Sequence, residues 1–198
     1  MNTLENFSLD MGLSWTMSKV SPFVLMLILG IVLFYIVRRK LTKKLLKSLA
    51  FVIIPIPIVI YFAISPIYEG DFTNEFTIAQ KSEARKELKD GHLAIITIPG
   101  CTYCYRALDN LKIIKDRVGS KDKLDFIVCS KDVSTLDWYK EKSNNEINVS
   151  MAHNISAMSE LAGGRYPCFA FVLNSGETRI WSNDGFGVMA KDWIEDNL

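Results

Sequence analysis

The sequence predicts an α/β protein in which a mixed central sheet flanked by helices follows a two-helix transmembrane hairpin. Two observations favour this class. Two long uncharged runs lie within the first 68 of the 198 residues, and from residue 69 onward short apolar strands alternate with amphipathic helices. The first 68 residues carry seven Lys and Arg against two Asp and Glu, and the remainder carries sixteen against twenty. This acidic second part has no basic patch with interleaved aromatic residues, so we expect no nucleic-acid partner.

Each of the two uncharged runs is long enough to cross a bilayer. Residues 20–37 and 48–68 contain no charged side chain, and about 20 apolar helical residues span the hydrocarbon core. Pro55 and Pro57 interrupt the second run, but membrane helices tolerate proline. A signal peptide fits the first run less well because the positive charges follow it, and a pair of buried core helices is the other alternative. Residues 1–19, without clear periodicity, are expected to form an exposed tail.

The loop between the runs predicts their orientation. Residues 38–47 carry six Lys and Arg and no acidic residue, and the positive-inside rule places such a loop in the cytoplasm. A hairpin at residues 20–68 then sends both the tail (residues 1–19) and the domain (residues 69–198) to the other side. We therefore expect a multi-pass membrane protein with an extracytoplasmic C-terminal domain, facing a bacterial periplasm or the outer surface of a membrane. Thiols in that domain would work in an oxidising compartment.

The first half of the domain is predicted to contain a β-α-β unit. Residues 77–89 are expected to form an exposed amphipathic helix before it. Apolar residues at 93–98 and 124–129 predict two strands, and the helical spacing between them predicts a helix that closes near Gly119. Such a connection needs a parallel pairing and a right-handed crossover.

The second half of the domain is predicted to add two helices, an antiparallel hairpin and a final helix. The hairpin is indicated by two apolar segments that flank the turn sequence NSGE. In chain order, the expected elements are a helix at 132–142, a loop at 143–149, a helix at 151–162, strands at 169–173 and 179–182, and a helix at 188–197.

The predicted chemistry lies where the first strand of the β-α-β unit meets its helix. Cys101 and Cys104 have C-x-x-C spacing and follow a Pro-Gly turn. We expect Cys101 at the helix N-terminus, where unpaired backbone N–H groups and the helix dipole favour a thiolate, with Cys104 one turn further on the same face. One sulfur can then attack a disulfide, and the other can resolve the mixed disulfide.

This arrangement resembles the thioredoxin fold over residues 72–198. Two local features carry the resemblance: the motif CTYC at residues 101–104, and GRYP at residues 164–167 directly before the predicted hairpin. The resemblance implies that the Tyr166-Pro167 bond is cis. It also implies that Pro167 lies beside the redox pair and that Tyr166 faces a bound substrate.

The chain departs from the thioredoxin pattern in three places. Gly100 stands where thioredoxins usually carry a tryptophan, and Ile95 stands where they often have a buried acid that accepts the proton of the second thiol. The dipeptide Thr102-Tyr103 matches neither thioredoxins nor protein disulfide isomerases. Proton transfer from Cys104 must then use water or another group.

The expected function is that of a membrane-anchored thiol–disulfide oxidoreductase that reduces or isomerises protein disulfides. Cys101 and Cys104 would be its catalytic residues and redox-active disulfide, with Tyr166 and Pro167 binding the substrate. The motif contains no charged residue or histidine to stabilise a thiolate strongly, which favours a reductant or isomerase over a strong oxidant. Protein thiols and disulfides are the expected partners. Because neither membrane run contains a cysteine, a separate membrane electron donor is also expected. No cofactor and no metal are expected.

Two alternatives remain open from the sequence. Cys101, Cys104, Cys129 and Cys168 would allow a Cys₄ metal site in a binding module, although the long spacings after the motif do not suggest one. A non-catalytic membrane subunit could use the same fold for assembly. Cys129 and Cys168 are otherwise expected to be buried apolar residues, or, for Cys168 next to Pro167, a third exchanging thiol.

Overall fold

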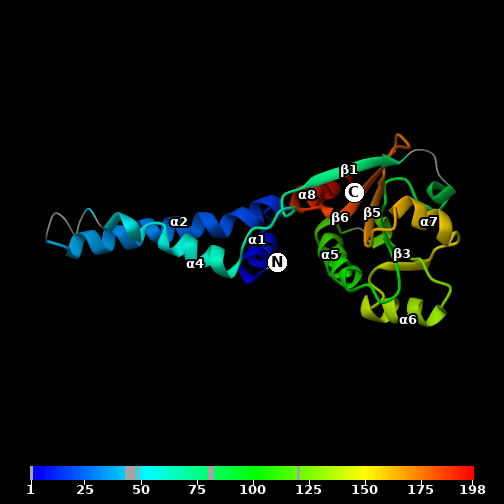
Figure 1. The fold of residues 1–198 in the computed structure, drawn as a ribbon, viewed down its shortest axis with the longest axis horizontal. Coiled ribbons are helices and arrows are strands. Elements are labelled where there is room, and N and C mark those ends of the chain that lie inside the picture. The colour runs from blue at the N-terminus through cyan, green and yellow to red at the C-terminus, as the bar shows by residue number, and fades with distance from the viewer. Residues whose placement is uncertain (1, 43–47, 49, 80–82, 120) are drawn as a thin grey trace. The chain divides into compact units, whose positions relative to one another are not determined.

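The computed structural model of the chain describes residues 2–42, 48, 50–79, 83–119 and 121–198. The chain divides into two compact units, Met1–Asp71 and Phe72–Leu198, which are described separately (Figure 1). The first unit contains α1 (Thr3–Asp10), α2 (Trp15–Lys40), the 3₁₀ helix η1 (Ala50–Ile53) and α4 (Ile56–Ile64).

Helix α2 contains the whole first uncharged run. It is long and apolar enough to cross a membrane, with a mean hydropathy of 2.7 over its most apolar window. Its N-cap is Ser14, whose side chain accepts a hydrogen bond from the Met17 backbone. Three basic residues of the predicted cytoplasmic loop, at positions 38–40, form its last turn. Residues 43–47 of that loop lie outside the described residues.

The second uncharged run does not form the single long helix that the sequence predicted. It is divided into η1 and α4, with Pro55 as the N-cap of α4. Proline has no backbone N–H, and its ring collides with the preceding helical turn, so the helix is interrupted there. Among the described helices, α2 alone meets the length and hydropathy of a membrane span. A hairpin of two spanning helices is therefore not shown.

The second run nevertheless packs along α2. A Cβ atom at Gly30 would lie 2.1 Å from the carbonyl oxygen of Ile54, so only glycine permits this close approach. Ring contacts join Phe34 to Phe51 and Phe23 to Tyr61, with centroids 4.6 and 4.9 Å apart. The run therefore follows α2 in the antiparallel direction over about 16 Å, at about 1.5 Å per residue.

The N-terminal segment is not the exposed tail that the sequence predicted. Helix α1 begins with a capping box, in which Asn2 and Glu5 each accept a hydrogen bond from the other's backbone N–H. Glu5, Ser8 and Leu9 are buried, as is Trp15 at the start of α2. Two of the three buried α1 positions are polar, which conceals its helical periodicity.

The second unit contains one six-stranded mixed sheet in the order β1-β6-β5-β2-β3-β4. Strand β2 pairs in parallel with β3, and β3 with β4, whereas the remaining pairs are antiparallel. This confirms the predicted mixed sheet and fits a thioredoxin-like arrangement. The strands are β1 (Asn74–Ala79), β2 (Leu93–Thr97), β3 (Leu124–Val128), β4 (Asn148–Met151), β5 (Cys168–Val172) and β6 (Thr178–Phe186).

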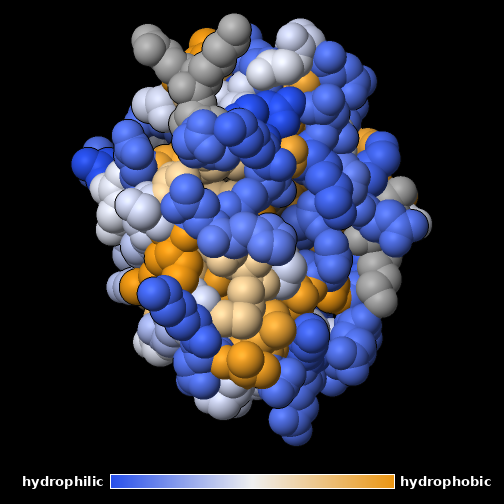
Figure 2. Space-filling model, turned by 90° about the vertical axis from the view of Figure 1, so that its right-hand side faces the viewer, coloured by the Kyte–Doolittle hydropathy of each residue, from blue (hydrophilic) through white to orange (hydrophobic). Residues whose placement is uncertain are grey.

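Helices cover both faces of this sheet (Figure 1). On one face, Met158 of α7 and Leu88 beside η2 join Ile96 of β2 in a buried cluster. On the other face, Tyr139 of α6 and Trp193 of α8 pack against strand aromatics. The helices are η2 (Glu83–Glu87), α5 (Thr102–Val118), η3 (Lys121–Lys123), α6 (Val133–Lys142), α7 (Ile155–Ala162) and α8 (Val188–Asn197). The face shown in Figure 2 is largely hydrophilic, with apolar residues gathered over part of it.

Most predicted elements of the domain are confirmed. The β2-α5-β3 unit is parallel, and α5 ends at Gly119 in the left-handed conformation that favours glycine. The α6 helix, the β5-β6 hairpin and the final helix also lie where expected. Helix α7 begins four residues later than predicted because Asn154 is its N-cap.

Two predictions for the domain are wrong, and both concern sheet edges. Residues 77–89 were expected to be helical, but β1 extends through Ala79 and η2 covers Glu83–Glu87, with residues 80–82 outside the described residues. The expected loop at 143–149 contains the start of β4. An edge strand exposes one side and has neighbours on only one flank, so its sequence need not show a clear apolar alternation.

Candidate active site

The C-x-x-C motif lies at the point where β2 passes into α5. Cys101 is the N-cap residue of α5, and its Sγ accepts a hydrogen bond from the Cys104 backbone N–H at 3.2 Å. Gly100, with φ of 71°, makes the preceding turn. The predicted placement of Cys101 at a helix start is therefore confirmed. The backbone donor and the helix dipole would both stabilise negative charge on this sulfur.

The two motif cysteines form a disulfide, and their surroundings differ. Cys101 is partly exposed, whereas Cys104 is fully buried at 0% exposure. The intervening Thr102 and Tyr103 are exposed. An incoming group can therefore reach the first sulfur and not the second, which is the asymmetry that an attacking and a resolving thiol require.

The segment before β5 also has the predicted geometry. The Tyr166-Pro167 bond is cis, as expected. Cys168 pairs with Ile96 of β2, so Pro167 lies at the end of the sheet from which the chain continues to Cys101. The Tyr166 side chain is partly buried against α7, where its hydroxyl donates a hydrogen bond to Ser159 Oγ at 2.9 Å. The Tyr166 hydroxyl thus already has a partner within the protein. That Tyr166 binds substrate stays a prediction, and it now concerns the backbone groups of this residue.

A buried hydroxyl pair lies beneath the loop that leads to Cys101. The Tyr139 hydroxyl donates to the carbonyl oxygen of Ile98 at 3.1 Å and lies 3.3 Å from Thr97 Oγ1. Both Thr97 and Tyr139 are fully buried. Burial raises the pKa of Tyr139, so its hydroxyl stays protonated and remains a donor at neutral pH.

Neither Thr97 nor Tyr139 was predicted from the sequence to belong to the site. Ile95, which stands where thioredoxins often carry a buried acid, is fully buried, and Thr97 projects from the same face of β2 two residues later. The Thr97 hydroxyl at the end of an apolar strand was the sequence feature that could have indicated the pair, because a buried polar group requires a hydrogen-bond partner. Tyr139 belongs to the core. Its neighbour Trp138 is 43% exposed, and its ring centroid lies 4.6 Å from that of Tyr105, with the two rings tilted by 49°.

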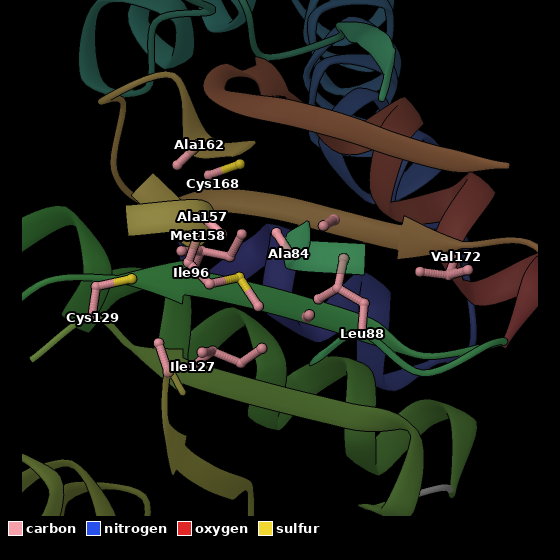
Figure 3. Packing of buried hydrophobic residues seen from close by; sticks show 13 residues of the cluster. Ala84, Leu88, Ile96, Ile127, Cys129, Ala157, Met158, Ala162, Cys168 and Val172 are labelled. Atoms are coloured by element: carbon pink, nitrogen blue, oxygen red, sulfur yellow. The ribbon is translucent and has the colours of Figure 1, made fainter. Parts of the chain in front are cut away.

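Cys129 and Cys168 lie in the buried cluster on the α7 face of the sheet (Figure 3). Burial raises the pKa of Cys129 to about 11 and that of Cys168 to about 12, so both remain neutral thiols near pH 7. Their predicted burial is confirmed. Among the described residues, no three Cys, His, Asp or Glu side chains gather as metal ligands. The four cysteines of the alternative Cys₄ interpretation are therefore not brought together.

Comparisons with known proteins add little to this geometry. The chain matches no family model and no curated protein. One similar solved structure is a secreted Mycobacterium tuberculosis disulfide oxidoreductase homologous to E. coli DsbE, with 16% sequence identity, covering 55% of this chain and 81% of that chain, at a TM-score of 0.40. A likeness at that level supports no conclusion about this chain. Its function must be inferred from its own fold and site.

We expect Tyr139→Phe to slow thiol exchange at Cys101. Loss of the hydrogen bond to Ile98 should lower the free energy of unfolding by about 1 kcal/mol, and the looser loop should slow reaction of reduced Cys101 with a small disulfide by about threefold to tenfold. Stopped-flow exchange kinetics across pH, well below the unfolding temperature, would measure the effect. Tyr105→Phe, which removes a hydroxyl from the adjacent ring, is the matched control. A destabilised variant with an unchanged exchange rate would show that Tyr139 supports the fold only.

Proposed function

We propose that this protein is a thiol–disulfide oxidoreductase that acts on protein disulfides through Cys101 and Cys104. The observation that carries the proposal is the placement of the Cys101 sulfur. Cys101 is partly exposed at the N-cap of α5, and its Sγ accepts a hydrogen bond from the Cys104 backbone N–H, while Cys104 is fully buried. The backbone donor and the dipole would favour the thiolate form of Cys101, and the buried Cys104 would react only with its neighbour.

The reaction follows from this asymmetry. In the reduced protein, the Cys101 thiolate attacks one sulfur of a substrate disulfide, and the other substrate sulfur leaves as a thiolate that takes up a proton. Cys104 then loses its proton and attacks Cys101 Sγ. The second substrate sulfur is released, and the Cys101–Cys104 disulfide forms. Two electrons pass from the motif to the substrate, so a donor must reduce the motif again. For isomerisation, the substrate itself displaces Cys101.

The proposal assigns substrate binding to the segment at Tyr166-Pro167. It lies at the same end of the sheet as the motif, and the Tyr166 side chain is held by Ser159. Backbone groups of Tyr166 would therefore meet an extended substrate chain, in the manner of strand addition. Exposed aromatic residues beside the motif, Tyr103 and Trp138, would contact the flanking substrate residues.

We further propose that the domain is anchored in the membrane and faces out of the cytoplasm. Helix α2 has the length and hydropathy of a span, and its basic last turn favours the cytoplasmic side. The second uncharged run follows α2 back toward its N-terminal end, which supports a second crossing by η1 and α4 together. In a bacterium, the domain would face the periplasm.

The residues around Cys101 bear on the direction of electron flow. Arg106, one turn after Cys101, is exposed, and the motif residues between the cysteines are uncharged. Stabilisation of the thiolate therefore comes mainly from the helix terminus, which favours a reductant or isomerase. The apolar segments contain no cysteine, so a separate membrane protein would supply the electrons.

Substrate trapping tests the proposed roles directly. Cys104→Ser leaves an attacking thiol without a resolving one, so it should accumulate mixed disulfides with cellular proteins, at about tenfold the level of the matched Cys101→Ser variant. Non-reducing gels followed by mass spectrometry would count and identify them. Equal trapping by both variants would contradict the assignment of Cys101 as the attacking thiol and Cys104 as the resolving thiol. Absence of trapping by either would support a non-catalytic membrane subunit.

Thiol labelling tests the compartment. In reduced spheroplasts, a membrane-impermeant maleimide should label Cys101 from outside. Cys129 and Cys168 are buried thiols with pKa values of about 11 and about 12, so they should stay unlabelled until the protein is denatured and serve as internal controls. If Cys101 is labelled only after lysis, the predicted orientation is wrong.

Redox equilibration tests the direction. When the full-length protein is equilibrated with glutathione buffers in detergent, its reduction potential should lie at or below ~−180 mV, because the helix terminus alone stabilises the thiolate moderately. Alkylation of the reduced fraction at each buffer ratio would give the value. A potential near ~−120 mV would identify a strong oxidant and refute the reductant interpretation.

A further inference from the structure

Helix α1 presents three separate sectors around its axis. Leu4 and Phe7 of α1 and Met11, its C-cap residue, follow one another at helical spacing and are 37%, 59% and 62% exposed, so they form one exposed apolar stripe. The buried sector consists of Glu5, Ser8 and Leu9. The third sector is exposed and polar, and it consists of Thr3, Asn6 and Asp10. In water, a helix of this size would be expected to turn its apolar stripe inward and its Glu outward.

Specific polar contacts fix α1 in this inverted orientation. The Asn2 side-chain amide donates to the Tyr61 hydroxyl of α4 at 2.5 Å and to Ser65 Oγ at 2.9 Å. Buried Glu5 lies 3.4 Å from Lys19 of α2, and an Asn2 backbone bond holds its other oxygen. These contacts hold the polar groups of α1 against α2 and α4, and the apolar stripe points outward.

Exposed apolar residues also occur at the start of α2. Met17 and Val20, in the first turns of α2, are 57% and 37% exposed, and large apolar residues remain exposed along the rest of that helix. Polar contacts inside and apolar side chains outside are the arrangement expected where the surrounding medium is lipid. The exposed polar sector of α1 requires water on another side.

We propose that α1 is an interfacial helix that lies in the membrane surface, with the lipid bilayer as the partner of its stripe. Leu4, Phe7 and Met11 enter the boundary between headgroups and acyl chains, and Asn6 and Asp10 face the aqueous side. The capping box and the Glu5–Lys19 pair hold this orientation. The proposal rests on α2 being a membrane helix and is independent of the redox chemistry.

Site-specific photocrosslinking in phosphatidylethanolamine–phosphatidylglycerol proteoliposomes tests the proposal on the full-length protein. The photoreactive residue p-benzoylphenylalanine replaces Phe7 or Met11 in two test proteins, and Asn6 or Asp10 in two matched controls on the same helix. After irradiation, mass spectrometry should find lipid adducts at Phe7 and Met11 in about tenfold excess over Asn6 and Asp10, since only the stripe enters the acyl boundary.

Crosslinking of proteins in which the orientation of α1 is perturbed gives a second measurement. Glu5→Gln weakens the pair with Lys19 and should reduce the excess at Phe7, whereas Asp10→Asn, which changes an exposed acid of the same helix, should leave it unchanged. Equal lipid adducts at all four positions, or adducts of Phe7 and Met11 with a second protein molecule, would overturn the proposal. So would an excess that neither Glu5→Gln nor Asp10→Asn alters, because the Glu5–Lys19 pair would then not set the orientation.

Discussion

The candidate site depends on the hydrogen bond between the Cys104 N–H and the Cys101 sulfur. An N-cap side chain normally serves only to satisfy an orphan backbone donor of a helix. In α5 the capping atom is also the accessible sulfur of the motif, so the same contact that begins the helix favours a thiolate. Helix formation and reactivity are therefore coupled at one atom. Anything that moves the preceding loop, which the Tyr139 hydroxyl holds at Ile98, changes both.

The sheet separates the four cysteines into two chemical classes. Cys101 and Cys104 follow β2 at the start of α5, whereas Cys129 and Cys168 face α7 within an apolar cluster. Desolvation opposes ionisation in that cluster and raises the pKa of both thiols. A neutral buried thiol is a poor nucleophile. The fold thus places four cysteines in one small domain, and Cys101 is the one that is partly exposed at a helix N-terminus.

The predictable part of the structure is the part with strong local patterns. The β2 and β3 strands are continuous apolar runs, α5 has apolar residues at helical spacing before Gly119, and the motif and Pro167 are visible as short sequences. The edge strands β1 and β4 were missed because their structure depends on pairing with distant partners. Tyr139 escaped detection for the same reason, since its hydroxyl acts on a loop 41 residues away.

The incorrect prediction of an exposed tail at residues 1–19 has a different physical origin. Sequence patterns are usually interpreted as if water were the only solvent, so a helix is expected to show an apolar side facing the protein. In α1, polar Glu5 and Ser8 face the protein, while apolar Phe7 and Met11 face outward. The helical periodicity is therefore present, but most of its buried positions are polar and its exposed stripe is apolar. Where a segment directly precedes a helix with the length and hydropathy of a membrane span, as α1 precedes α2, two solvents must be considered. A short helix with an apolar sector and a polar sector that are both exposed is then the pattern expected at their boundary.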